Sequence, residues 1–120
     1  MTDREELEIA VKALDSKKAA KITALKVGDL TILGNYFVIA SASSTTQVKA
    51  LADEVEYRLQ QAGVTPKSIE GAQSRNWIVL DYIDIIVHIF LEETREFYQL
   101  EHLWADGEPV DISGIIAEQS

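Results

Sequence analysis

The 120-residue sequence contains no cysteine and only two prolines. The absence of cysteine excludes disulfide bonds and metal sites built from thiolates, and it fits a protein of a reducing compartment. No low-complexity run and no internal repeat interrupts the chain, and 47% of its residues are hydrophobic. A chain of this length and composition is predicted to form one globular domain with its own core.

Basic residues are also few, because 11 lysines and arginines stand against 20 acidic residues and leave a net charge of -9. This charge repels nucleic-acid phosphates and anionic lipids, so the expected partner is a basic protein, without direct sequence-specific binding of nucleic acid. No apolar run approaches the roughly 20 residues of a membrane helix. The acidic start, MTDREELEIA, has the pattern of neither a signal peptide nor an Arg-rich transit peptide. We therefore expect a soluble, cytoplasmic protein with no membrane partner.

Two helices are predicted from capping-box spacings followed by apolar residues at helical intervals. The first begins after Thr2, which is paired with Glu5. The second begins after Ser44, which is paired with Gln47, and ends before Gly63. Between the two helices, residues 21–27 (KITALKV) predict a short strand, and residues 36–42 (YFVIASA) predict a central strand that is buried on both faces.

The second half of the chain predicts a short strand at 68–70, a β-hairpin at 77–90 and a third helix at 92–104 with Phe97, Leu100 and Trp104 on one side. A strand, a helix and a further strand require a crossover, so one parallel pair should accompany the antiparallel hairpin. The predicted fold class is α/β: a single domain, with a mixed, mainly five-stranded sheet and about three packing helices. Residues 1–106 form this domain, and the tail 107–120 either folds back or remains flexible.

The hairpin, WIVLDYIDIIVHIF, has two unlike faces. A two-residue turn at Tyr82 and Ile83 would pair Trp77 with His88. One face is then wholly apolar, as packing against helices requires: Ile78, Leu80, Ile85 and Val87. The other face combines an aromatic ring, aliphatic side chains and carboxylates, like the core and rim of a binding patch: Trp77, Val79, Asp81, Asp84, Ile86 and His88.

These polar and aromatic residues also have purely structural interpretations. Trp77 can be a core residue, and His88 can be a hydrogen-bonded strand histidine. Asp81 and Asp84 can be turn residues, or they can bind a cation as in nucleotidyltransfer sites, although no glycine-rich phosphate loop precedes them. Because no GxSxG, HExxH or P-loop pattern occurs, we expect neither an enzyme nor a bound cofactor or metal.

Residues 76–104, NWIVLDYIDIIVHIFLEETREFYQLEHLW, resemble the signature of the ribosomal silencing factors, also called the Iojap or DUF143 family. The matching positions are Trp77, Asp81, Asp84, His88, Arg95, Tyr98, Leu100, Glu101 and Trp104. Upstream, YFVIASASSTTQVKALADEV and the pair Glu70 and Gly71 match as well. The likeness therefore covers about residues 5 to 106.

This resemblance implies a nucleotidyltransferase-like topology and a protein that binds the large ribosomal subunit through its ribosomal protein number fourteen. Binding would block joining of the small subunit and repress translation when nutrients are short. The implied partner-binding residues are Glu70, Trp77, Asp81, Tyr82, Asp84, His88 and Tyr98. Family members form homodimers, a state that this sequence neither supports nor excludes. The alternatives are an enzyme using Asp81 and Asp84, and a dimeric adaptor for large-subunit assembly.

Ile83 departs from the family pattern, which usually has glycine in the hairpin turn. A β-branched residue is strongly disfavoured at the positive φ that a type I′ turn requires. Another turn type could shift the strand register by one residue and thereby exchange the two faces of the hairpin.

Overall fold

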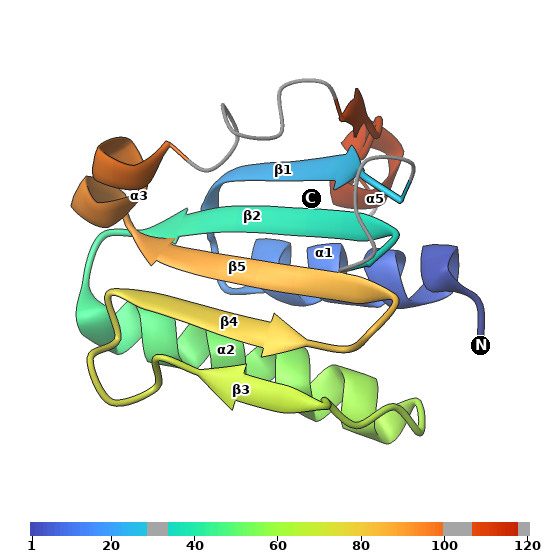
Figure 1. The fold of residues 1–120 in the computed structure, drawn as a ribbon, viewed down its shortest axis with the longest axis horizontal. Helices are drawn as coiled ribbons and strands as arrows, with labels where there is room; N and C mark the ends of the chain where they lie inside the picture. Colours follow the sequence, from blue (N-terminus) through green and yellow to red (C-terminus); the bar gives the residue numbers. More distant parts are fainter. Residues whose placement is uncertain (29–33, 100–106, 118–120) are drawn as a thin grey trace.

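The computed structural model describes residues 1–28, 34–99 and 107–117. Within these ranges the chain forms a six-stranded sheet in the order β3-β4-β5-β2-β1-β6, with helices α1 and α2 on one face (Figure 1). The strands are β1 (Ala20–Lys26), β2 (Tyr36–Ala42), β3 (Ser68–Glu70), β4 (Trp77–Asp81), β5 (Ile85–Leu91) and β6 (Glu108–Pro109). The helices are α1 (Asp3–Ser16), α2 (Thr45–Gln61), α3 (Glu92–Tyr98) and α5 (Ser113–Ala117). The predicted α/β class is confirmed, with a sixth strand and a fourth helix.

Local sequence signals explain the ends of the two long helices. The Thr2 hydroxyl accepts a hydrogen bond from the Glu5 amide at 3.1 Å, and the Glu5 carboxylate accepts one from the Thr2 amide at 3.0 Å. The Ser44 hydroxyl caps α2 by accepting from the Gln47 amide, and Gly63, at φ +87°, follows its last turn. Both predicted helices are confirmed, but the Gln47 side chain accepts from the Ser43 amide, so the predicted capping box at Ser44 is only half formed.

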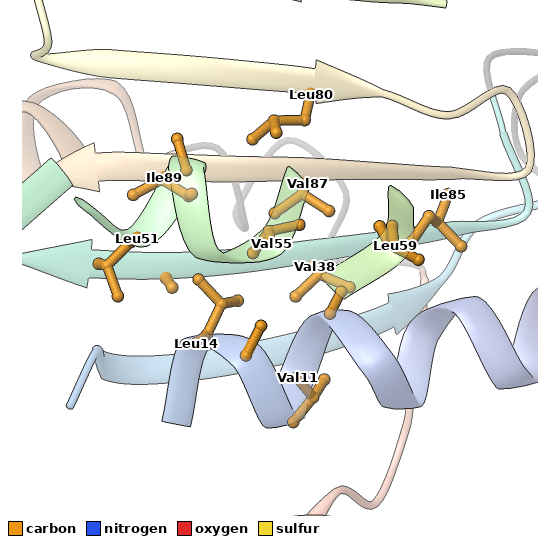
Figure 2. Packing of buried hydrophobic residues seen from close by; sticks show 14 of the residues in the cluster. Val11, Leu14, Val38, Leu51, Val55, Leu59, Leu80, Ile85, Val87 and Ile89 are labelled. Atoms are coloured by element: carbon orange, nitrogen blue, oxygen red, sulfur yellow. The ribbon is translucent and has the colours of Figure 1, made fainter. Parts of the chain in front are cut away.

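The centre of the sheet is the parallel pair β2 and β5, and the other strand pairs are antiparallel. Six of the seven residues of β2 are buried, which confirms the predicted central strand. The main core lies between the sheet and the helices, where side chains of α1, α2, β2, β4 and β5 interdigitate (Figure 2). A second, smaller core occupies the opposite face of the sheet: Leu25, Val27, Phe37, Ile39, Ile86 and Phe90.

The hairpin register differs from the prediction by two residues. Trp77 pairs with Phe90 and Val79 pairs with His88, because four residues, 82–85, separate the paired Asp81 and Ile86, whereas the prediction placed only two between paired residues. Side chains alternate with a period of two along a strand, so an even shift keeps each strand residue on its predicted face. The predicted apolar face is accordingly buried against the helices. Asp84, however, is a turn residue and does not pair with Asp81, which corrects that part of the prediction.

The turn itself is a γ-turn centred on Ile83. The Asp84 amide donates to the Tyr82 carbonyl at 2.8 Å, and Ile83 has φ +73°. The Asp81 carboxylate supports the turn by accepting from the Ile83 amide, also at 2.8 Å. A β-branched residue with a side chain 62% exposed thus holds a backbone conformation that favours glycine.

We expect Ile83→Gly to raise the free energy of unfolding by about 1 kcal/mol, because relief of the left-handed conformation exceeds the added flexibility of glycine. Urea denaturation measures the change. Ile83→Ala is the matched control, since alanine loses the same exposed side chain but retains the strained Cβ. A glycine variant no more stable than the alanine variant would show that the turn is not strained.

The first part of the tail folds back onto the domain. Strand β6 pairs with β1 at the edge of the sheet, with Leu25 opposite Pro109. Helix α5 follows, and its Ile115 is buried in the main core against α1. Of the two alternatives for the tail, residues 107–117 therefore show the packed one.

Helix α3 is shorter than predicted. It ends at Tyr98, and Gln99 adopts a left-handed conformation with φ +48° that terminates the helix. Leu100 and Trp104 lie outside the described residues, while Phe97, predicted on the packing side, is 81% exposed. Across the described ranges, no helix is long and apolar enough to cross a membrane.

Candidate partner-binding surface

An aromatic cluster covers the sheet beside the beginning of β4, on the face opposite α1 and α2. The Trp77 ring stacks on Phe90 with centroids 4.8 Å apart, and Tyr98 of α3 contacts it at 5.0 Å. Trp77 lies diagonally across the strand pair from His88, and its Nε1 donates to the His88 Nδ1 at 3.1 Å. Trp77 is half-buried, so part of the indole is held firmly while the rest reaches solvent.

His88 supports this cluster from below and is itself inaccessible. Its side chain is 7% exposed and lies against the Phe37 ring at 5.1 Å and the Phe90 ring at 6.2 Å. Burial lowers the pKa of His88 to about 4, so the imidazole is neutral near pH 7. Because Nδ1 accepts the bond from Trp77, the proton of the neutral ring resides on Nε2, which has no partner within the described residues. His88 is thus a buried, hydrogen-bonded histidine of strand β5, as its structural interpretation predicted.

A shallow hollow lies next to Trp77, lined by Glu70, Gly71, Trp77 and Val79. Its walls come from the edge strand β3 and from β4, which pair with Glu70 opposite Val79. The hollow combines an aromatic ring, an aliphatic side chain and one carboxylate. Four of the predicted site residues are therefore brought together at this end of the hairpin: Glu70, Trp77, His88 and Tyr98.

Gly71 shapes this hollow, a role that the sequence match alone did not reveal. Its φ is +85°, and a Cβ at this position would lie 2.0 Å from the Trp77 carbonyl oxygen. Both the backbone conformation and the close approach require glycine. The loop that joins β3 to β4 can therefore press directly against the backbone of Trp77.

We expect Gly71→Ala to lower the free energy of unfolding by about 2 kcal/mol, because the added methyl group must push the Trp77 backbone aside at an unfavourable φ. Thermal denaturation measures the loss. Gly63→Ala is the matched control, since Gly63 also has positive φ but nothing lies within 4 Å of its added Cβ. Equal losses in the two variants would show that backbone conformation alone is responsible.

The remaining predicted site residues lie at or beyond the other end of β4, whose last residue, Asp81, is about 13 Å from Trp77 at ~3.3 Å per residue. Asp81 is engaged with the turn. Tyr82 is only 4% exposed and belongs to the helix-side core, where burial raises the pKa of its hydroxyl. A buried tyrosine is scaffold rather than an accessible contact, so the structure does not bring Tyr82 to the surface with Trp77.

Asp84 lies against the first turn of α1 rather than beside Trp77. Its carboxylate forms an acidic cluster with Asp3 and Glu6, with ligand oxygens within 4.8 Å of one another. Burial, followed by the charges of Asp84 and Asp3, raises the pKa of Glu6. The N-terminus of α1 offsets part of this negative charge through its dipole. The Asp81 carboxylate instead accepts from the Ile83 amide, so the two aspartates of the enzyme alternative have different partners.

A family model described as "Ribosomal silencing factor during starvation" matches residues 1–120 of this chain. The chain belongs to that family. A ribosomal silencing factor of Halalkalibacterium halodurans is 35% identical over 117 residues, covering 98% of this chain and 100% of the relative. A solved structure of a Chromobacterium violaceum protein has a TM-score of 0.86 at 36% identity, covering 88% of each chain.

A more distant relative of this ribosomal silencing factor comes from mouse. It is named "Mitochondrial assembly of ribosomal large subunit protein 1" and is 30% identical over 82% of this chain and 45% of its own length. The family resemblance carried by the hairpin is thus confirmed over the whole domain.

Proposed function

We propose that this protein is a cytoplasmic ribosomal silencing factor that binds the large ribosomal subunit through the exposed surface around Trp77. The contacted component is a basic large-subunit protein, number fourteen in the standard nomenclature. Occupation of that site blocks joining of the small subunit by steric exclusion and represses translation when nutrients are short. The action requires binding alone, without catalysis.

One observation carries the proposal: a half-exposed tryptophan is held rigidly between Phe90, His88 and Tyr98 and lies beside the carboxylate-bearing hollow of Glu70. Large aromatic anchors on a fixed support lose little conformational freedom on binding and often dominate interface energies. The net charge of -9 favours encounter with a basic protein. Family membership and the name of the mouse relative support the large ribosomal subunit as the target.

The seven site residues divide into four roles in this proposal. Trp77 and Tyr98 are the aromatic contacts, and Glu70 is an acidic residue at their rim. His88 and Tyr82 act from inside the domain, His88 by holding the indole and Tyr82 by anchoring the turn. Asp81 and Asp84 extend the negative surface along the hairpin away from Trp77.

The proposal is tested by co-sedimentation of the purified protein with isolated large and small subunits. We expect binding to the large subunit alone, and we expect Trp77→Ala to weaken it at least ~30-fold, because central aromatic residues contribute about 2 kcal/mol or more to such interfaces. Tyr57→Ala is the matched control, since Tyr57 is an exposed aromatic residue on α2, across the sheet. Absence of wild-type binding at low salt would reject the proposal.

The name of the mouse relative favours a second role of the same surface in large-subunit assembly. Ribosome profiles from cells lacking the protein distinguish the two roles. Loss of silencing changes the fraction of joined subunits during starvation, whereas an assembly role leaves incomplete large subunits during growth.

A further inference from the structure

A second hollow lies beside the Tyr98 ring of the aromatic cluster, between α3 and the residue that precedes β4. It is lined by Asn76, Glu93, Thr94, Phe97 and Tyr98. Its volume of about 250 Å³ is below the range of roughly 300–1,000 Å³ that is usual for small-molecule sites. A single side chain of a partner suits a hollow of this size.

The aromatic residues of this hollow are unusually accessible. Phe97 is 81% exposed and Tyr98 is 50% exposed, and their rings meet edge to face with centroids 5.1 Å apart. Residues 93 and 97 are four apart, as are 94 and 98, so one face of α3 presents two rings beside a carboxylate and a hydroxyl. The Tyr98 ring also contacts Trp77, so this hollow continues the surface assigned to the partner.

The polar residues of the hollow favour a positively charged occupant. Glu93 is exposed and makes no ion pair within the described residues, whereas its neighbour Glu92 lies 3.7 Å from Lys21. Aromatic faces attract cations, and a guanidinium group can stack on a ring while it hydrogen-bonds to a carboxylate. The Asn76 side chain adds a neutral hydrogen-bonding group at the rim.

We propose that the α3 hollow binds one cationic side chain, preferentially arginine, from the basic partner of the Trp77 surface. The guanidinium stacks on Phe97 and Tyr98 and pairs with the Glu93 carboxylate. This inference rests on the proposed function for the identity of the partner, but the chemistry of the hollow can be tested without the ribosome.

The direct test is an NMR titration of the full chain with N-acetyl-arginine methylamide, compared with the uncharged citrulline analogue. We expect saturable shifts of the Phe97 and Tyr98 ring signals and the Thr94 amide, at least ~3-fold larger for arginine than for citrulline. Glu93→Gln and Phe97→Ala should abolish this difference. Equal shifts with both compounds, no saturable shifts, or full retention in the two variants would overturn the inference.

The second test is co-sedimentation with the large subunit, in which Glu93→Gln and Phe97→Ala should each weaken binding ~5- to 10-fold. Glu108→Gln is the matched control, because it removes the same charge from an exposed residue of the edge strand β6. Wild-type affinity in both α3 variants would reject the arginine site and leave the proposed function intact. Failure of the wild-type protein to bind would reject the proposed function, while the titration still decides the chemistry of the hollow.

Discussion

Replacing Arg95 with alanine is expected to lower the free energy of unfolding by about 4 kcal/mol. The substitution removes a buried guanidinium group together with all of its hydrogen bonds. Its Nη1 donates to the Lys21 carbonyl at 2.7 Å and to the Ser41 hydroxyl at 2.8 Å, and its Nη2 donates to the Thr23 hydroxyl at 3.3 Å. Lys21 lies where β1 departs from regular pairing and has φ +51°. The substitution would leave these acceptors unsatisfied and detach α3 from the sheet.

Urea denaturation measures the stability lost, and amide hydrogen exchange across α3 shows whether the helix loosens locally. Arg58→Ala is the matched control, because Arg58 pairs with Glu54 on the partly exposed side of α2, and its loss should cost less than about 1 kcal/mol. A similar small loss for Arg95→Ala would mean that α3 is held in place by other contacts. Arg95→Lys should recover only part of the stability, since an ammonium group cannot reproduce the hydrogen-bond geometry of the planar guanidinium group.

Acidification is expected to destabilise the protein through His88 by about 3 kcal/mol between pH 6.5 and pH 4. The folded-state pKa of about 4 is lower than the usual value of 6.5, so the unfolded chain binds more protons across this window. Stability is therefore complete above pH 6.5 and declines as the pH falls toward 4. Protonation would also place a proton on Nδ1, where the Trp77 Nε1 donates its hydrogen bond.

Stability curves from pH 8 to pH 4 test this expectation in wild type and His88→Asn, which cannot titrate but retains an acceptor for the indole. Glu6 acts in the opposite direction, because its raised pKa makes the folded state bind more protons in acid. Both proteins contain Glu6, so the difference between their stability curves gives the contribution of His88 alone. His102→Asn, which changes the other histidine of the sequence, is the matched control. Parallel curves for wild type and His88→Asn would contradict the assigned role.

The core of this fold was predictable because its signals are local and repeated. The capping box at Thr2 and the side-chain cap of Ser44 define where α1 and α2 begin, and the apolar run of β2 identifies a strand buried on both faces. The two faces of the hairpin were predictable even though its turn was not. Period-two alternation depends only on whether a residue is odd or even in number, and the actual register differs by two.

The site could be predicted only in part, because its remaining features depend on contacts distant in sequence. Tyr82 resembles a surface turn residue until α1 and α2 cover it, and Asp84 is drawn toward Asp3 and Glu6 by the path of the turn. The close approach of Gly71 to the Trp77 carbonyl is likewise a property of the folded loop. The end of α3 at Tyr98, followed by the left-handed Gln99, and the exposure of Phe97 are also features of the folded chain that the apolar spacing did not predict.

The even shift in the pairing of β4 with β5 also bears on how the sequences of such proteins can diverge. The tip of the turn is exposed at Ile83. The strands beside it place one set of side chains in the helix-side core and the other set in the aromatic surface. Changes that move the pairing by two residues keep both surfaces in place, whereas a one-residue slip would bury the wrong set of side chains. Natural variation at the tip should therefore shift the strand pairing only by even numbers of residues, so that turns of different length can support the same aromatic surface.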